Sequence, residues 1–159
     1  MKKIIMVSTN NTCRSFIAES LLRQLLLDAH QKNIEVISRG LVVLFPEPVH
    51  VKAADMVIQK CGIESLDFQS AQLTQEEVEQ SDLILTMTEE QKEKILEEYH
   101  GYKEIATLNE YASVEGAIID PYGMEDDDYE RCFEQIAHLV KKIWEERLGG
   151  NEMIGIGSD

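Results

Sequence analysis

The chain is poor in cysteine, proline and basic side chains. The low cysteine content and the acidic charge each exclude a class of protein. Its 159 residues include three cysteines and three prolines, and 15 basic against 30 acidic side chains give a formal charge of −15. An odd number of widely spaced cysteines is not typical of a disulfide framework, so a reducing, cytoplasmic compartment is predicted. The negative charge repels nucleic acid and anionic lipid, so neither is predicted as a partner.

Long apolar runs are also absent. The run from Ile4 to Val7 follows two lysines but is too short for the core of a signal peptide, and no later run approaches the thickness of a membrane. A chain of this length that is 43% hydrophobic can bury one substantial core. We therefore expect one cytoplasmic domain over residues 1–148, with residues 149–159 as a tail or linker.

Short apolar runs alternate with amphipathic stretches along the chain. Strands are predicted at residues 3–7, 34–38, 83–87 and 105–108. Helices are predicted at residues 15–30, 51–60, 75–80, 89–99 and about 129–143. This alternation predicts a single α/β domain with a central four-stranded parallel sheet and helices on both faces. Ligands bind such sheets beyond the carboxyl ends of the strands, where the loop after the first strand meets a helix.

Residues 8–15, Ser-Thr-Asn-Asn-Thr-Cys-Arg-Ser, occupy that position. Backbone N–H groups that curl at the start of a helix form an anion-binding nest, which predicts phosphate or a similar anion as the ligand. Arg14 adds a planar fork of donors that can hold two phosphate oxygens at once. The predicted phosphate-binding residues are Thr9, Asn10, Asn11, Thr12, Cys13, Arg14 and Ser15.

The segment from Val7 to Glu19 resembles the signature of the low-molecular-weight protein-tyrosine-phosphatase family, in which a cysteine is followed by five residues, an arginine and a serine. Ser38-Arg39-Gly40, Thr88 after the third strand and Asp120-Pro121-Tyr122-Gly123 occur in the order and at the distances that this family uses. The resemblance implies a hydrolase that dephosphorylates proteins through a covalent phosphoenzyme, without a cofactor or metal. Independently, the four histidines show no ligand spacing with the cysteines, which disfavours a metal site.

The resemblance also implies roles for single residues. Ser8 stands where the family has its nucleophilic cysteine, Arg14 binds phosphate, and Asp120 serves as acid and then as base. A serine hydroxyl stays protonated where a cysteine in the same nest would be a thiolate, and the sequence neighbourhood contains no histidine to act as its base. We therefore expect this chain to bind phosphate but to be inactive or to trap its ligand.

Other residues match supporting positions of the family. Asn11, Ser15 and Ser38 match the polar network that holds the loop and hydrogen-bonds the nucleophile. The walls of the pocket are expected from Tyr122 and from Leu44 or Phe45 in an apolar, proline-containing loop.

Two origins of Ser8 are open. Asn10, Phe16 and Phe68 depart from the glycine, proline and histidine that are usual in the family, which indicates natural drift in a chain that has lost catalysis. In contrast, the anion-binding residues and the acid all remain. This retention favours an active parent in which a cysteine was replaced by Ser8 to trap ligand.

Thr12 predicts the substrate. Tyrosine-specific members of the family carry isoleucine or leucine at this position, whereas its phosphoarginine phosphatases carry threonine. A smaller hydroxyl-bearing side chain leaves room for a guanidinium group, and the acidic surface suits arginine-rich substrates. Phosphoarginine is therefore preferred over phosphotyrosine, although Tyr122 would serve phosphotyrosine at least as well.

Two alternatives remain for the activity. In the first, the chain is a non-catalytic module that binds phosphoproteins through Arg14 and the nest. In the second, it is a redox relay of the arsenate-reductase type. The relay needs a cysteine at position 8 and further resolving cysteines, so Ser8 and the distant Cys61 and Cys132 argue against it, and Cys13 is interpreted as structural.

Residues 153–159, Met-Ile-Gly-Ile-Gly-Ser-Asp, resemble the start of a B-type ribose-5-phosphate isomerase. This resemblance implies a fused isomerase domain joined through residues 149–152. The alternative is a flexible tail.

Overall fold

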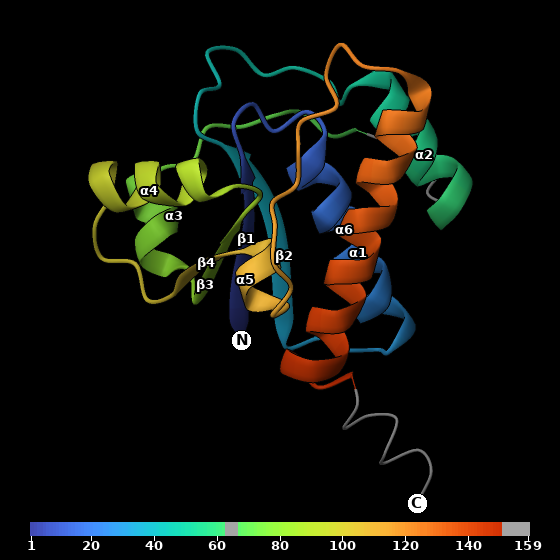
Figure 1. Cartoon of the computed structure of the whole chain (residues 1–159). Helices are drawn as coiled ribbons and strands as arrows, with labels where there is room; N and C mark the ends of the chain where they lie inside the picture. Colours follow the sequence, from blue (N-terminus) through green and yellow to red (C-terminus); the bar gives the residue numbers. More distant parts are fainter. Residues whose placement is uncertain (63–66, 151–159) are drawn as a thin grey trace, which may run out of the picture.

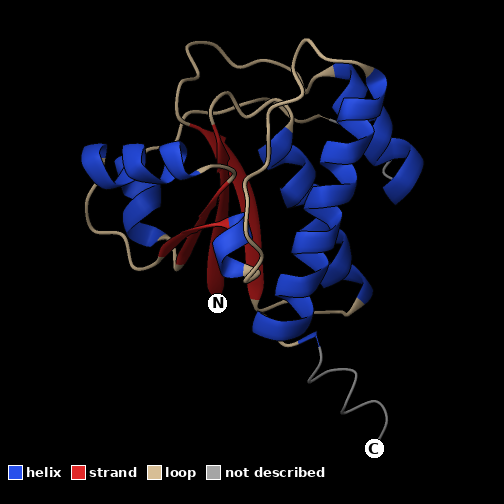
Figure 2. Cartoon of the chain, in the orientation of Figure 1, coloured by secondary structure: helices blue, strands red, loops and turns tan. Residues whose placement is uncertain are grey.

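A computed structural model describes residues 1–62 and 67–150 and confirms the predicted α/β domain. Four parallel strands form one sheet in the order β2-β1-β3-β4 (Figure 2). The strands are β1 Lys2–Ser8, β2 Ile34–Gly40, β3 Leu83–Thr86 and β4 Ile105–Thr107. In the register, Ser8 lies opposite Gly40 and Val7 lies opposite Thr86, so the three longest strands end at one edge.

Helices cover both faces of the sheet, as predicted (Figure 1). They are α1 Arg14–Asp28, α2 Val51–Cys61, α3 Gln75–Gln80, α4 Glu89–Glu98, α5 Leu108–Tyr111 and α6 Asp126–Arg147. The helices α1, α2 and α6 pack together on one face, and α3 and α4 lie on the other. Among the described residues, no helix is both long and apolar enough to cross a membrane.

The alternation of side chains along β1 divides the interior into two cores. Ile4 and Met6 belong to the larger core under α1 and α6, whereas Ile5 and Val7 belong to the smaller core under α3 and α4. Neighbouring residues of a strand point to opposite faces, so a strand covered on both sides must be apolar throughout. This requirement explains why β1 carries no exposed residue between Ile4 and Ser8.

The structure differs from the prediction after the fourth strand. Leu108 was expected to end that strand, but it begins the short helix α5, which was not predicted. Thr107 caps this helix by accepting a hydrogen bond from the N–H of Glu110, and the carboxylate of Glu110 accepts one from the N–H of Thr107. The spacing Thr-x-x-Glu is a sequence signal for a helix start and would have located α5.

Gly40 ends β2 directly against the loop that follows β1. A Cβ atom at this position would lie 2.5 Å from Cγ2 of Val43 and 3.1 Å from the carbonyl carbon of Asn10. The Val43 side chain can move, but the backbone of Asn10 cannot move without displacing the loop. We expect Gly40→Ala to lower the free energy of unfolding by about 1–3 kcal/mol, measured by urea denaturation.

The double variant Gly40→Ala, Val43→Ala is the control for this prediction. It removes the closer of the two contacts and should recover only part of the loss. An unchanged urea midpoint for Gly40→Ala would contradict the close packing of β2 against the loop.

Candidate active site

The loop predicted to bind phosphate connects β1 to α1 at the carboxyl edge of the sheet (Figure 1). Ser8 is the last residue of β1, and Arg14 is the first residue of α1. The neighbouring segments hold the loop between them. The N–H of Leu41 donates to the carbonyl of Thr9 at 2.9 Å, and the amide of Gln91 donates to the Thr9 hydroxyl at 3.1 Å.

A buried network of hydrogen bonds surrounds the Ser8 hydroxyl. The hydroxyl oxygens of Ser8 and Ser15 are 2.6 Å apart, and the backbone N–H of Asn11 donates to Ser8 Oγ at 3.3 Å. The Asn11 amide donates to Ser15 Oγ at 2.8 Å and to Ser38 Oγ at 3.0 Å. Asn11 has a φ of 60°, a left-handed conformation that asparagine adopts more readily than most residues. The structure thus brings Ser8 together with the three residues predicted to surround it, Asn11, Ser15 and Ser38.

A second layer of polar contacts supports this network. Ser38 donates to a carboxylate oxygen of the buried Glu19 at 2.7 Å, and Glu19 forms an ion pair with Arg23 at 3.0 Å. The backbone N–H of Ala71 donates to Asn11 Oδ1 at 3.0 Å. Sequence reasoning assigned no role to Glu19 or Ala71. Glu19 lies within the segment that carries the family resemblance, which was the only signal for it.

Arg14 connects the loop to the segment that contains Asp120. Its guanidinium group donates to the carbonyl of Ile118 at 2.8 Å and lies 3.7 Å from the carboxylate of Asp120. The Arg14 side chain is 6% exposed and that of Asp120 is 42% exposed. The N–H of Ile118 donates to the carbonyl of Met87, just after β3, so the Asp120 segment is attached to the same edge of the sheet. A buried cation and a more accessible carboxyl group therefore meet at the loop.

The start of α1 is suited to an anion. Cys13 occupies the N-cap position without accepting a capping hydrogen bond through its side chain, and the first turn contains no acidic residue. The partial positive charge of the helix end is therefore not neutralised by the helix itself. The helix end and Arg14 both favour a bound anion at the loop.

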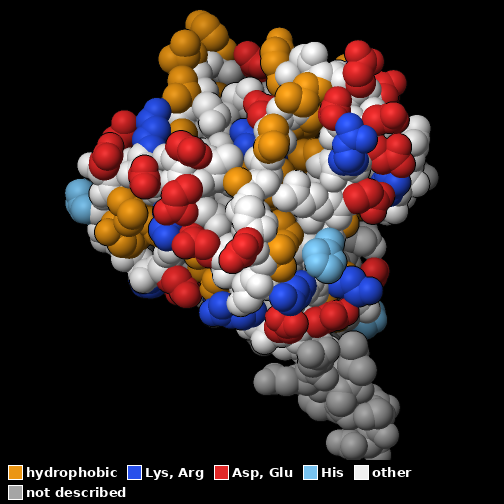
Figure 3. Space-filling model, in the orientation of Figure 1, with side chains coloured by type: hydrophobic (Ala, Val, Ile, Leu, Met, Phe, Trp, Pro, Cys, Tyr) orange, Lys and Arg blue, Asp and Glu red, His pale blue; other side chains and the backbone are white. Residues whose placement is uncertain are grey.

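Exposed apolar side chains rim the site. Leu44 and Phe45, 83% and 74% exposed, line a cavity of about 190 Å³ that also includes Asn10 of the loop. Tyr122, 72% exposed, lies in the segment before α6. Figure 3 shows hydrophobic side chains gathered on the rim that these loops form. The three residues predicted as pocket walls are therefore accessible to a bound molecule.

Most of the chain matches one protein family. The family model for low molecular weight phosphotyrosine protein phosphatase matches residues 3–152. The low molecular weight protein-tyrosine-phosphatase PtpB of Staphylococcus haemolyticus is 33% identical over 141 residues, which cover 89% of this chain and 96% of that protein. The chain belongs to the low-molecular-weight protein-tyrosine-phosphatase family. The family resemblance predicted from the loop and from the Asp-Pro-Tyr-Gly segment is confirmed.

Solved structures of this phosphatase family have the same fold. The low molecular weight protein tyrosine phosphatase of T. tengcongensis is 29% identical, with a TM-score of 0.85 over 92% of this chain and 99% of the other. The YwlE arginine phosphatase was solved as a cysteine-to-serine mutant with a phosphorylated active-site serine. It is 29% identical, with a TM-score of 0.84 over 95% of this chain and 99% of the other. The predicted isomerase fusion concerns residues outside the described part of the chain.

His50 lies next to the loop of residues 8–15 in the structure. The sequence did not indicate this, because His50 is far from the loop along the chain. The backbone N–H of His50 donates to the carbonyl of Thr12 at 2.8 Å. Its imidazole faces the N–H of Lys52 and the hydroxyl of Tyr129, and no hydrogen bond joins it to Ser8 within the described residues. Tertiary structure thus places a histidine beside the loop, but among the described residues it does not give Ser8 a base.

The Cys13 thiol is buried beneath the loop, beside Cys132 of α6. A hydrogen bond with the Cys132 thiol and burial both raise the pKa of Cys13 well above its usual range. A thiol with a raised pKa is a poor nucleophile at neutral pH. This environment agrees with the structural interpretation of Cys13.

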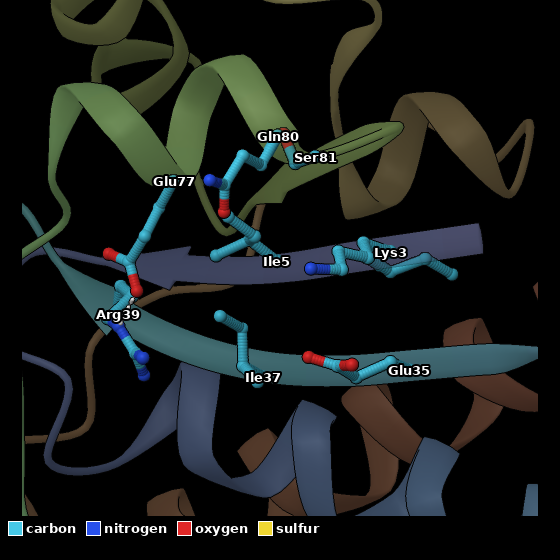
Figure 4. Close-up of a pocket in the computed structure, with 9 residues that line it drawn as sticks. Lys3, Ile5, Glu35, Ile37, Arg39, Glu77, Gln80 and Ser81 are labelled. Atoms are coloured by element: carbon cyan, nitrogen blue, oxygen red, sulfur yellow. Dashed lines mark hydrogen bonds and ion pairs between the residues drawn. The ribbon is translucent and has the colours of Figure 1, made fainter. Parts of the chain in front are cut away.

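A further cavity lies between the sheet and α3, away from the phosphatase loop. It has a volume of about 180 Å³, and Figure 4 shows Lys3 and Arg39 facing it together with Glu35 and Glu77. Two cations and two anions leave the lining without net charge. Within residues 1–62 and 67–150, no group of three or more histidine, cysteine or acidic side chains could hold a metal ion.

Proposed function

We propose that this chain is a protein phosphatase in which residue 8 takes a phosphoryl group from a phosphorylated protein, with phosphoarginine preferred over phosphotyrosine. The observation that carries the proposal is that Asp120, from a distant part of the chain, meets the loop that contains Ser8 and Arg14. Ser8 lies at the foot of the loop, Arg14 opens α1 behind it, and Asp120 lies 3.7 Å from Arg14. These are the positions needed for a nucleophile, an anion binder and an acid.

The reaction follows from these positions. The loop N–H groups and Arg14 bind the phosphate oxygens, and Arg14 stabilises the charge that builds on them in the transition state. The bond between Ser8 Oγ and phosphorus forms while the bond from phosphorus to the leaving nitrogen or oxygen breaks. Asp120 donates its proton to the leaving atom, and the Ser8 proton moves to a phosphate oxygen. In the second step, water attacks phosphorus while the bond from phosphorus to Ser8 Oγ breaks. Asp120 accepts a proton from the water, and the proton on the phosphate oxygen returns to Ser8 Oγ.

Serine at position 8 affects both steps. The hydroxyl is a weak nucleophile because Ser15 and Asn11 are neutral and cannot act as a base for it. Release of the phosphoryl group then requires an alkoxide to leave, which is much less favourable than departure of a thiolate. We therefore expect phosphorylated Ser8 to accumulate. The phosphorylated active-site serine in the related arginine phosphatase supports this expectation.

The preference for phosphoarginine rests on Thr12 and on charge. The Thr12 hydroxyl donates to Oδ1 of Asn10 at 3.1 Å, which leaves its oxygen lone pairs available to a guanidinium N–H. The net charge of −15 favours encounter with arginine-rich proteins. The arginine phosphatase among the similar structures gives the same preference further support.

A non-catalytic phosphoprotein-binding role is the second candidate. The observation in its favour is the neutral surroundings of Ser8, which would let the loop hold a phosphoprotein without accepting its phosphoryl group. An arsenate-reductase-like relay is less well supported, because position 8 has no thiol and Cys132 lies beside Cys13 instead.

Mass spectrometry of the unaltered chain distinguishes these candidates. After incubation with a phosphoarginine protein, we expect the chain to gain the mass of one phosphoryl group, with peptide mapping locating it on Ser8. A phosphotyrosine protein should transfer the group more slowly.

Ser8→Ala is the matched control and should gain no phosphoryl group. Binding of the phosphoprotein without any transfer would favour the non-catalytic role, and a phosphoryl group attached elsewhere would contradict the assignment of position 8.

A further inference from the structure

The start of α2 lies between the phosphate loop and the segment that follows Asp120. His50 caps this helix, and its backbone N–H donates to the carbonyl of Thr12 at 2.8 Å. The helix start is therefore fixed to the phosphate loop through the backbone, while the side chains at its first positions are free to contact other parts of the chain.

The His50 imidazole contacts two tyrosines from the neighbouring segment. Its Nδ1 accepts a hydrogen bond from the N–H of Lys52 at 3.2 Å, so a neutral ring carries its proton on Nε2, which lies 3.4 Å from the Tyr129 hydroxyl. The ring stacks on Tyr129 with centroids 5.2 Å apart and meets Tyr122 edge-on at 6.0 Å. His50 is thus the link between the phosphate loop and both tyrosines.

Lys52 adds three contacts to the same segment. Its ammonium group forms an ion pair with Asp126 at 2.9 Å and donates to the carbonyl of Met124 at 3.4 Å. It also lies 4.9 Å from the centre of the Tyr129 ring, within the range of a cation–π interaction. We call His50 and Lys52 the α2 clasp, because together they hold the segment from Tyr122 to Tyr129.

This segment needs such support. Tyr122, Met124 and Asp126 are exposed, and exposed loops with few buried contacts open easily. Asp120 is in the same turn, since its carboxylate accepts a hydrogen bond from the N–H of Tyr122 at 3.1 Å. An acid must lie within hydrogen-bond reach of the leaving atom, and a misplacement of about 1 Å can cost about 100-fold in rate.

We propose that His50 and Lys52 are positioning residues that hold the Asp120 turn over the phosphate loop, so that Asp120 can protonate the leaving group. The proposal rests on the proposed function, in which Asp120 is the acid. The clasp acts through Tyr122, Met124 and Asp126, and within the described residues no hydrogen bond or ion pair joins either of its side chains to Ser8.

The dependence of rate on the leaving group tests the clasp. Phenyl phosphate needs a proton from the acid because phenolate leaves poorly, whereas 2,4-dinitrophenyl phosphate hardly needs one. In the Ser8→Cys background, we expect His50→Ala to lower kcat/KM, which reports transfer of the phosphoryl group to residue 8, by about 10- to 100-fold for phenyl phosphate. For 2,4-dinitrophenyl phosphate, kcat/KM should change less than about threefold, and the dissociation constant for inorganic phosphate should stay the same.

Two further variants separate positioning from helix stability. Asparagine is a good N-cap, so His50→Asn keeps the cap of α2 but lacks the ring that contacts Tyr122 and Tyr129. It should retain the unfolding midpoint of the parent and still show the leaving-group-dependent loss. His138→Ala, which removes an exposed histidine of α6, should change neither rate.

Asp120→Asn in the same background distinguishes failure of the proposed function, in which Asp120 is the acid, from failure of the α2 clasp. If Asp120→Asn lowers kcat/KM equally for both substrates, Asp120 is not the acid and the proposed function is wrong at that point. If Asp120→Asn shows the selective loss of kcat/KM but His50→Ala and His50→Asn do not, the acid assignment holds and the clasp is overturned. An equal loss of kcat/KM for both substrates in the His50 variants would also overturn it.

Discussion

Replacing Ser8 by cysteine is expected to raise the hydrolysis of phosphorylated peptides by about 10⁴- to 10⁶-fold, the range that loss of a catalytic nucleophile costs in other enzymes. A thiol in this position would lie at the start of α1 and near Arg14, and both lower its pKa from about 8.5 toward neutrality. The resulting thiolate attacks phosphorus readily and also leaves readily when water arrives. The measurement is kcat/KM for release of inorganic phosphate from otherwise identical phosphoarginine and phosphotyrosine peptides.

The two peptides also test the proposed preference. We expect the Ser8→Cys variant to favour phosphoarginine, and a further Thr12→Ile change to shift the ratio of the two kcat/KM values toward phosphotyrosine. An inactive Ser8→Cys variant that still binds phosphate would overturn the enzyme assignment. An active variant with the opposite preference would overturn only the interpretation of Thr12.

Removal of the Arg14 side chain should abolish detectable binding of inorganic phosphate to the chain. Arg14 is the buried cation of the site, and its loss removes a pair of charge-assisted hydrogen bonds to the anion. The same change leaves the carboxylate of Asp120 without its cationic neighbour, which adds repulsion against a phosphate dianion. Isothermal titration calorimetry of Arg14→Ala is expected to show a dissociation constant at least about 100-fold above that of the unaltered chain.

Arg14→Lys and Arg39→Ala are the controls for this prediction. The lysine variant keeps the charge but not the planar fork, so it should bind phosphate with intermediate affinity. Arg39 pairs with Glu77 on the other side of the sheet, and its removal should leave phosphate binding unchanged. Phosphate binding that survives in Arg14→Ala would show that the anion binds outside the loop.

Local patterns explain which parts of the structure were predictable. The run from Lys3 to Val7 and the amphipathic stretch after Ser15 each have one secondary structure that buries their apolar side chains, and both formed as expected. The short helix α5 was missed because four residues carry too little periodicity, although its capping pair was present in the sequence. The family resemblance predicted that Arg14 and Asp120 act in one site, and the two side chains lie 3.7 Å apart.

Contacts between distant segments were not predictable in the same way. Neither the hydrogen bond from Ser38 to Glu19 nor the approach of His50 to Thr12 follows from the spacing of these residues along the chain. Such contacts depend on how the strands align at the edge of the sheet and on the path of each connecting loop. The residues that make them become neighbours only when both cores are packed.

By itself, the sequence determined the α/β class and the two short motifs that carry the family resemblance, residues 8–15 and Asp-Pro-Tyr-Gly, because periodicity and short motifs are local properties of a chain. Only the tertiary structure decided that Glu19, Ala71 and His50 contact the loop network, that Arg14 meets Asp120, and how the Asp120 turn is held. The physical reason is that hydrogen bonds and ring contacts act over a few ångströms, and the residues that make them here lie tens of positions apart.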